Sequence, residues 1–180
     1  MSPSSSVHTN LIAGFINCSC LEIKDSPIQG KGVFSQESLA RGTKLFSLDG
    51  EIKGHVYEPF MAEQNPNWIG IGYENWIVLP AGHFGLYINH SCRPNVIINE
   101  QLEVITLSPV KPHEELLLDY STTELDPYWK MICACGVPEC RKMLRSFQFL
   151  PPQLQIIYND FISPSFTAGV NMLAVHQRAS

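Results

Sequence analysis

Three cysteines lie within eight residues in the stretch CACGVPEC, at positions 133, 135 and 140. The Gly and Pro between them favour a tight turn, so the three thiols can converge on one point. Convergent thiolates are typical ligands of zinc, and a closed structural zinc site takes four ligands. The fourth must come from elsewhere, and we predict Cys92. The alternative is three free cysteines in a small loop.

The other cysteines do not favour a disulfide framework. The N-terminal stretch MSPSSSVHTN lacks the basic start of a secretory signal, and clustered thiols in a reducing compartment more often hold metal. We therefore predict an intracellular protein, cytoplasmic or nuclear. Cys18 and Cys20 could compete for the metal, but they stand at the entry to a predicted strand, where we expect one small core residue and one free thiol.

Length, apolar runs and net charge argue against several other classes of protein. A chain of 180 residues predicts one domain. Its longest apolar runs, such as 77–79 and 116–118, fall far short of the roughly 20 residues that a membrane-spanning helix needs. The net charge of −5 argues against an extended nucleic-acid interface. We interpret the one basic cluster, Arg141, Lys142 and Arg145, as a solvated face.

Short apolar runs between turn residues predict a mostly β domain. The predicted strands are CLEIKDS, KLFSLDGEIK, NVIINE, LEVITL and EELLLDY, which begin at residues 20, 44, 95, 102 and 114. The segment 53–75 has mixed signals, and YEPFMAEQ within it could hold a short helix. Near the C-terminus, Leu154, Ile157, Tyr158 and Phe161 have helical spacing after a Pro, which predicts an amphipathic helix.

Five motifs follow one another in a specific order. They are Gly-x-Gly at 30–32, Asp-Gly-Glu at 49–51, Asn-His-Ser-Cys-x-Pro-Asn at 89–95, Glu-Glu-Leu-x-x-Asp-Tyr at 114–120, and the three clustered cysteines. From about Leu21 to Leu144 this set resembles the SET-domain methyltransferases with a post-SET zinc knuckle. The resemblance implies a β-clip (SET-domain) fold, in which several short twisted β-sheets surround a knot-like crossing, with a C-terminal helix.

The resemblance also implies a division of the chain and its cofactors. Residues 1–20 would be a lead-in, 21–128 the SET domain with a variable insert at about 53–78, 129–145 the post-SET zinc knuckle, and 146–180 a C-terminal helical tail. The implied cofactors are S-adenosyl-L-methionine and a structural zinc ion, with four zinc ligands: Cys92, Cys133, Cys135 and Cys140.

Individual roles follow position by position from the same resemblance. The backbone around Lys31 and Gly32 would bind the methionine part of the cofactor, and Asn89 with His90 would bind the adenosyl part. Tyr120 would contact the cofactor and act as the catalytic residue that orients the acceptor amine. The alternatives are a core histidine at 90 and an amphipathic strand end at 120.

The acceptor side departs from the family pattern. Leu118 stands where relatives usually carry Tyr or Phe, which leaves space and removes a hydroxyl, so we predict that di- or trimethylation of lysine is allowed. Gly85, Leu86 and Tyr87 replace Ala-Arg-Phe, which removes a cation, and Pro80 interrupts a common strand. Tyr87 and Tyr73 are candidates for the acceptor channel, with core packing as the alternative.

Three functions are compatible with these residues. The leading prediction is an enzyme, a protein-lysine N-methyltransferase that uses S-adenosylmethionine. The second is a SET-fold enzyme acting on a small molecule of secondary metabolism, as a methyltransferase or a non-methylating cyclase. The third is a non-catalytic interaction module. The predicted partner is a protein lysine or a small molecule, without direct nucleic-acid or membrane binding.

Overall fold

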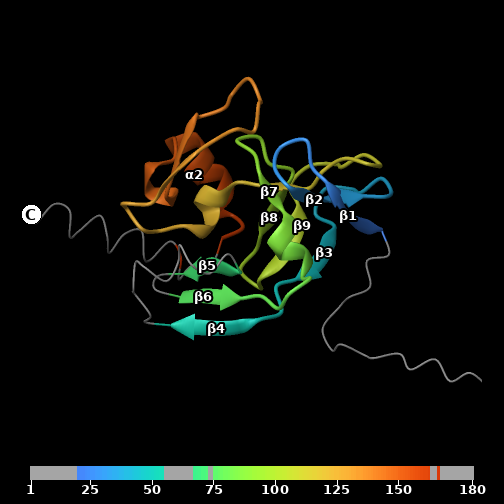
Figure 1. Cartoon of the computed structure of the whole chain (residues 1–180). Coiled ribbons are helices and arrows are strands. Elements are labelled where there is room, and N and C mark those ends of the chain that lie inside the picture. Colours follow the sequence, from blue (N-terminus) through green and yellow to red (C-terminus); the bar gives the residue numbers. More distant parts are fainter. Residues whose placement is uncertain (1–19, 55–66, 73–74, 163–165, 167–180) are drawn as a thin grey trace, which may run out of the picture.

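Five small β-sheets form most of the described fold (Figure 1). The computed structural model describes residues 20–54, 67–72, 75–162 and 166. The three-stranded sheets are β3 (Lys44–Ser47), β9 (Glu103–Thr106) and β8 (Val96–Ile98), and β4 (Glu51–Gly54), β6 (Asn75–Val78) and β5 (Trp68–Gly72). The two-stranded sheets pair β1 (Leu21–Asp25) with β2 (Lys31–Ser35), β7 (Asn89–His90) with β10 (Leu117–Leu118), and β11 (Lys130–Ile132) with β12 (Met143–Arg145).

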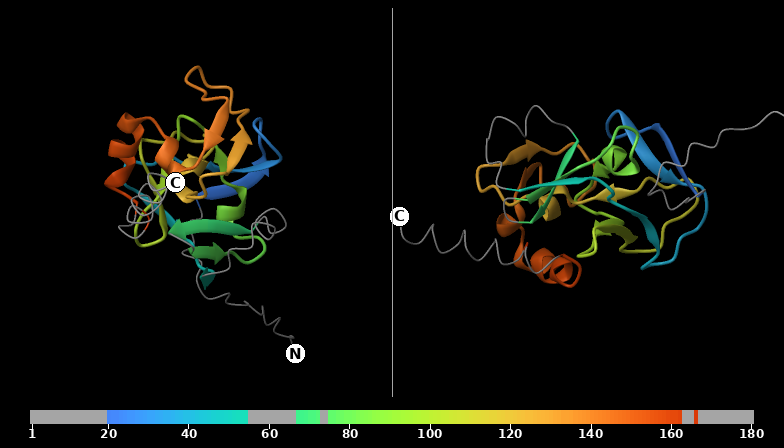
Figure 2. Two further views of the ribbon diagram at one scale, coloured as in Figure 1. Left: turned by 90° about the vertical axis from the view of Figure 1, so that its left-hand side faces the viewer. Right: turned by 90° about the horizontal axis from the view of Figure 1, so that it is seen from below.

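Helical structure in the described residues is short. One α-helix, α2 (Pro152–Asn159), follows the strands, and the 3-10 helices are η1 (Phe84–Tyr87), η2 (Tyr120–Thr123) and η3 (Phe147–Phe149). The prediction of a mostly β fold with several short sheets and a C-terminal helix is therefore confirmed. Figures 1 and 2 place α2 and the β1–β2 hairpin on opposite sides of the molecule.

The Gly-x-Gly motif forms the end of a hairpin turn and the start of β2. Gly30 has φ +51°, a left-handed conformation that glycine adopts without steric cost. The turn is closed by the Ser26 N–H, which donates to the Gly30 carbonyl at 2.8 Å, and by the Ser26 hydroxyl, which accepts from the Ile28 N–H at 3.0 Å. The chain therefore reverses here and pairs β1 with β2 antiparallel.

The segment 114–120 is the main correction to the predicted strands. Only Leu117 and Leu118 form a strand, β10, which pairs parallel with β7. The Asp119 carboxylate then accepts a hydrogen bond from the Ser121 N–H at 3.1 Å and caps η2, so Tyr120 starts a 3-10 helix and does not end a strand. Asn89 and His90 form β7.

Two of the apolar clusters in the described residues are large. The larger is formed by the strands from β1 to β10 and contains the fully buried Val33, Val104 and Leu116. The second lies beneath the C-terminal region and contains Phe147 and Tyr158. Leu118 of β10 belongs to the larger cluster, and Cys92 and Cys133 form a third, smaller cluster with Leu144.

The C-terminal helix differs in detail from the prediction. Tyr158 is buried, and Leu154 and Phe161 pack partly buried against the second core. Ile157, predicted to lie on the same face, is 52% exposed. The helix ends at Asn159, and the N–H groups of Phe161 and Ile162 both donate to the Tyr158 carbonyl, so Phe161 reaches the core from the turn that follows the helix.

Several predicted features lie outside the described residues, namely the helix at 57–64, Cys18, Tyr73 and most of the lead-in. Cys20 packs partly buried against the main core, as expected for a small core residue, but it is disulfide-bonded and is not a free thiol. Within the described ranges there is no helix with the length and apolar content needed to traverse a bilayer.

Candidate cofactor and metal site

The β7–β10 pair brings residues 89–92 beside residues 117–120. Besides the strand pairing, the Ser91 N–H donates to the Leu118 carbonyl at 3.0 Å. The buried Asn95 side chain joins the same two segments, because its amide donates to the Glu115 carbonyl at 2.8 Å and its oxygen accepts from the Leu117 N–H at 2.8 Å. Asn95 had no predicted role beyond its place in the motif of residues 89–95. In the structure, Asn95 fixes the register between the two segments.

Asn89 connects β7 to the β1–β2 hairpin. Its side-chain nitrogen lies 3.1 Å from the Gln29 carbonyl, 3.0 Å from the Lys31 carbonyl and 2.8 Å from Glu115 Oε1. The predicted cofactor residues at 31–32 and 89 are therefore neighbours. The Asn89 side-chain oxygen accepts no hydrogen bond from the described residues, which leaves an acceptor available to a ligand.

Tyr120 lies against His90 and points back toward β7. The two rings have centroids 5.3 Å apart, and the Tyr120 hydroxyl donates to the Ile88 carbonyl at 2.9 Å. Burial, together with the nearby Glu115 carboxylate, raises the pKa of Tyr120 to about 12. The phenol is therefore neutral at physiological pH, with its proton held by Ile88 and its oxygen lone pairs available as acceptors.

His90 lies between Tyr120 and the cysteine cluster. Burial lowers the pKa of His90 to about 4, although the Asp119 carboxylate opposes this shift, so the imidazole is neutral. Its Nδ1 accepts from the Tyr120 N–H at 3.2 Å. In that tautomer the proton lies on Nε2, which is 3.4 Å from Cys92 Sγ and donates to it.

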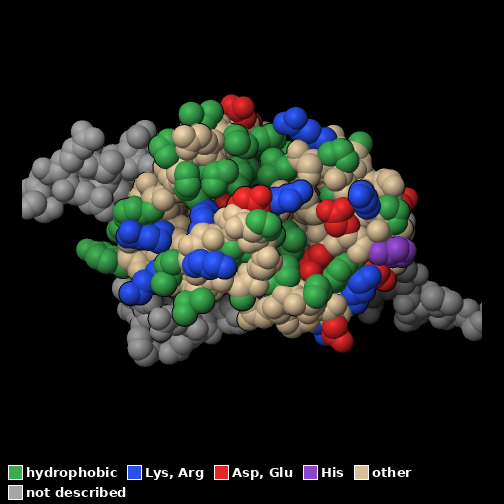
Figure 3. All heavy atoms as spheres, turned by 90° about the horizontal axis from the view of Figure 1, so that it is seen from above, with side chains coloured by type: hydrophobic (Ala, Val, Ile, Leu, Met, Phe, Trp, Pro, Cys, Tyr) green, Lys and Arg blue, Asp and Glu red, His purple; other side chains and the backbone are tan. Residues whose placement is uncertain are grey.

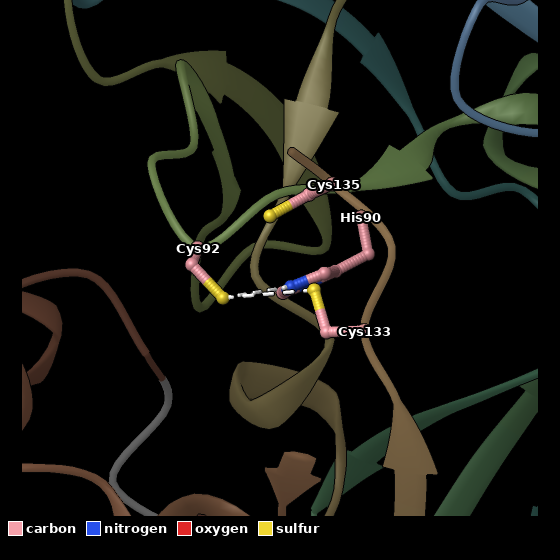
Figure 4. Close-up of side chains that lie close together, drawn as sticks. All are labelled: His90, Cys92, Cys133 and Cys135. Atoms are coloured by element: carbon pink, nitrogen blue, oxygen red, sulfur yellow. Dashed lines mark hydrogen bonds between the residues drawn. The ribbon is translucent and has the colours of Figure 1, made fainter. Parts of the chain in front are cut away.

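The thiols of Cys92, Cys133 and Cys135 converge with the His90 ring (Figure 4). One ligand atom from each of these four residues lies within 4.8 Å of all the others. The Cys92 and Cys133 sulfurs are 3.8 Å apart, which matches the roughly 3.8 Å expected for two sulfurs at about 2.3 Å from a tetrahedral zinc ion. The donor set therefore fits a soft divalent metal.

Cys140 lies at the edge of this cluster. Its Sγ is 3.9 Å from the Cys133 carbonyl and accepts from the Lys142 N–H at 3.4 Å, and the Arg141 N–H lies 3.3 Å from Cys92 Sγ in the same way. Backbone N–H donors of this kind stabilise thiolates. The hairpin of β11 and β12 closes the loop, because the Cys133 N–H donates to the Lys142 carbonyl at 2.8 Å.

The predicted solvated basic face is wrong for Arg141. Its Nη2 donates to Asp119 Oδ1 at 2.6 Å, and the Asp119 side chain is fully buried. The Arg141 Nε also donates to Cys92 Sγ at 3.4 Å. Arg141 thus joins the cysteine cluster to the residue before Tyr120, whereas Lys142 and Arg145 are exposed.

Leu118 and Tyr87, the described residues among those predicted for the acceptor side, are held by the main core. Leu118 is 5% exposed and pairs with His90 across the β7–β10 ladder, and Tyr87 is partly buried against the same cluster. A pocket beside η2 is lined by Thr122, Thr123, Gly70 and Phe166, among others. Neither Tyr87 nor Leu118 lines that pocket.

Two acidic residues of the site were missed. Glu115 and Asp119 are both buried and lie within the motif of residues 114–120, where only Leu118 and Tyr120 were given roles. Their position in this motif was the one sequence signal that could have identified them as site residues. What each contacts depends on residues far away in the chain, so their roles emerge only from the fold.

The SET domain family model matches residues 30–121 of this chain. The chain belongs to the SET-domain family. The matched segment contains the β2 strand, the β7–β10 pair and Tyr120, so the SET domain accounts for the predicted cofactor residues. The predicted resemblance to the SET-domain family and the predicted fold are confirmed, and the post-SET zinc knuckle stays a prediction.

Curated relatives of this SET domain are histone-lysine N-methyltransferases. Drosophila melanogaster histone-lysine N-methyltransferase trr is 29% identical over 133 residues, which cover 66% of this chain and 6% of that protein. Homo sapiens histone-lysine N-methyltransferase 2D is also 29% identical over 133 residues, covering 66% of this chain and 2% of its own length. The chain therefore spans only a small part of these relatives.

Solved structures similar to this SET domain include two of KRYPTONITE. One is in complex with mCHG DNA and SAH, with a TM-score of 0.53, 25% identity, and coverage of 68% of this chain and 28% of that one. The other is in complex with mCHH DNA, an H3(1-15) peptide and SAH, with a TM-score of 0.53, 26% identity, and coverage of 69% and 29%. KRYPTONITE carries the demethylated cofactor in both.

Proposed function

We propose that this SET domain is an S-adenosylmethionine-dependent protein-lysine N-methyltransferase. The observation that carries the proposal is that the Asn89 side chain binds the β1–β2 hairpin while the adjacent His90 contacts Tyr120. The names of the curated relatives and the SAH in the KRYPTONITE structures support the cofactor and the reaction class.

We infer that the backbone at Lys31 and Gly32, the Asn89 side chain and His90 hold the cofactor. The unpaired side-chain oxygen of Asn89 suits an amino or hydroxyl donor of an adenosyl group, and its nitrogen is already used to hold the hairpin. When bound, S-adenosylmethionine supplies an electrophilic methyl group. The residues of this chain contribute alignment and the exclusion of water.

Tyr120 is the proposed catalytic residue. Because its hydroxyl proton is donated to the Ile88 carbonyl, its oxygen can accept an N–H of the acceptor amine and orient the nitrogen lone pair. The amine must first lose a proton, and its ordinary pKa of about 10.4 falls in a desolvated site next to a cation. Leu118 in place of an aromatic residue supports di- or trimethylation as part of the proposal.

The metal is proposed to be a structural zinc ion bound by Cys92, Cys133, Cys135 and Cys140. Its ligands come from both the β7 loop and the β11–β12 hairpin, so metal binding would fix the hairpin to the SET domain. In comparable small sites metal binding contributes on the order of 10 kcal/mol to folding. The division into 21–128, 129–145 and 146–180 is proposed on the same basis, since a separate apolar cluster surrounds these cysteines.

The proposed partner is a lysine in a histone or another protein, and the proposed location is inside the cell. The names of the relatives support both. No direct nucleic-acid contact is part of the proposal, because the net charge is −5 and acidic and basic side chains are interspersed on the face seen from above (Figure 3). This remains a prediction, since KRYPTONITE was solved with DNA.

The test is transfer of label from S-adenosylmethionine by the metal-loaded full chain. Acceptors are a histone H3 peptide, cell extract and a panel of small metabolites. We expect label in a lysine, lost in Tyr120→Phe and retained in Tyr128→Phe, which removes a phenol that is 85% exposed. Label in a metabolite alone would favour the small-molecule enzyme. Cofactor binding without any transfer would favour a non-methylating cyclase or a non-catalytic interaction module.

A further inference from the structure

Glu115 is a buried acidic residue at the centre of the proposed cofactor site. Its side chain is held by the Ser26 hydroxyl, which donates to Oε2 at 3.0 Å, and by the Asn89 amide, which donates to Oε1 at 2.8 Å. The residue as a whole is 8% exposed. Both donors are uncharged, and an ionised carboxylate has acceptor capacity beyond two hydrogen bonds.

The carboxylate also lies directly against the glycine strand. A Cβ placed on Gly32 would be 2.1 Å from Glu115 Oε1, far inside van der Waals contact. Glycine at position 32 is therefore required for the carboxylate to occupy this place. The β2 backbone at Lys31 and Gly32, the Asn89 side chain and the Glu115 carboxylate form one continuous surface, with β2 beside β7 as in Figure 1.

No cation in the described ranges pairs with Glu115. The nearest lysines of the hairpin are used elsewhere, since Lys31 Nζ pairs with Asp25 at 3.3 Å and Lys24 Nζ pairs with Glu22 at 2.7 Å. Buried charges in proteins are normally paired with a charge of opposite sign.

We propose that Glu115 supplies the negative charge that neutralises the cationic part of S-adenosylmethionine. This inference rests on the proposed function, because it takes the surface around Gly32 and Asn89 as the cofactor site. The cofactor carries two positive groups, a sulfonium and an ammonium. Recognition by Glu115 is electrostatic, so a carboxylate is needed at this position and an amide of the same shape is insufficient.

The test compares the affinities of three ligands by calorimetry with the metal-loaded full chain. S-adenosylmethionine has both positive groups, S-adenosylhomocysteine has only the ammonium, and methylthioadenosine has neither. We expect Glu115→Gln to weaken S-adenosylmethionine binding by about tenfold or more and to leave methylthioadenosine within about twofold. Loss for S-adenosylmethionine alone assigns the sulfonium, and loss for S-adenosylhomocysteine as well assigns the ammonium.

Two further variants separate charge from structure. Glu114→Gln removes the neighbouring charge, whose carboxylate accepts from the Lys111 N–H and the Asn95 amide, and is expected to change no affinity. Glu115→Asp keeps the charge and is expected to retain the preference for S-adenosylmethionine over methylthioadenosine. The Glu115→Asp variant also tests the proposal if Glu115→Gln does not fold. A folded Glu115→Asp protein that no longer prefers S-adenosylmethionine over methylthioadenosine would contradict the proposal.

The outcomes that overturn the proposal differ from those that overturn the function. An equal loss for all three ligands in Glu115→Gln assigns Glu115 a purely structural role, and unchanged affinities assign it none. Either result overturns the inference while leaving the cofactor site intact. A folded wild-type protein that binds none of the three ligands overturns the proposed function itself.

Discussion

The Tyr158 hydroxyl donates a hydrogen bond to Asp119 Oδ2 at 3.2 Å. Tyr158 is on α2, and Asp119 is the residue before Tyr120, so this contact joins the C-terminal helix to the proposed catalytic segment. The other oxygen of Asp119 accepts from Arg141 Nη2 and from the Ser121 N–H. One buried carboxylate therefore connects the SET strands, the cysteine hairpin and the C-terminal tail.

Removal of the Tyr158 hydroxyl will destabilise the protein modestly. Tyr158→Phe leaves the ring in the second core and deletes one hydrogen bond to a buried carboxylate, which contributes about 1–2 kcal/mol to the free energy of unfolding. Chemical denaturation of the metal-loaded chain measures the change. The control is Ile157→Ala on the exposed side of the same helix, which we expect to change stability by about 0.5 kcal/mol or less. Equal effects of the two variants would show that the hydrogen bond contributes nothing.

Loss of the Arg141 guanidinium will have a larger effect. Arg141→Met leaves the Asp119 carboxylate buried and without its cation, which costs about 3 kcal/mol or more of unfolding free energy. Affinity for metal will also fall, because the Arg141 Nε donates to Cys92 Sγ. The matched variant is Arg145→Met, since Arg145 is exposed and lies over the Phe149 ring. Equal free energies of unfolding for Arg141→Met and Arg145→Met would contradict a stabilising ion pair between Arg141 and Asp119.

The metal will be coordinated by four sulfur atoms. His90 uses Nδ1 to accept from the Tyr120 N–H and Nε2 to donate to Cys92, so it is not free to be a ligand in this tautomer. X-ray absorption of the purified chain should give four sulfurs at about 2.3 Å. Cys140→Ser will lose the metal, and His90→Gln will keep it. A spectrum with three sulfur ligands and one nitrogen ligand, together with loss of the metal in His90→Gln, would contradict this prediction. The fourth ligand would then be His90 and not Cys140.

The Tyr120 phenol will lose its proton at a higher pH than an ordinary tyrosine. Its pKa is raised to about 12 by burial and by Glu115, so the folded state holds its proton longer than the unfolded state does. Tyr120 therefore contributes stability that is present below about pH 10 and is lost as the pH rises toward 12. The difference in tyrosinate absorbance between wild type and Tyr120→Phe measures this. A difference spectrum that develops at or below pH 10 would contradict the buried, neutral phenol.

Part of the cysteine cluster could be predicted because its information is local. Cys133 and Cys135 are separated by one residue, so their thiols can reach one point, whereas Cys140, predicted as a ligand with them, lies outside the group of four close ligand atoms, which includes His90. Cys92 was the remaining candidate within a motif of recognisable order. His90 was placed at the cofactor by the same motif, but its contact with Cys92 Sγ depends on the β7–β10 pairing and could not be read from spacing.

The acidic residues show where prediction from sequence ends. The nearly continuous apolar run in EELLLDY indicates a strand, yet the Asp119 side chain caps η2 and turns the chain after Leu118. Glu115 contacts Ser26, which is 89 residues away along the chain, and Asp119 contacts Tyr158, 39 residues away. No local periodicity encodes such pairings, because they arise from packing between separate elements.

The most direct test of the central claim is a calorimetric titration of the metal-loaded full chain with S-adenosylhomocysteine. We predict one binding site per chain, with an affinity that falls in Asn89→Ala, because Asn89 joins the hairpin to β7 and offers the open acceptor oxygen. A folded, metal-loaded protein that gives no heat of binding with S-adenosylhomocysteine or S-adenosylmethionine would contradict the assignment of this surface as a cofactor site.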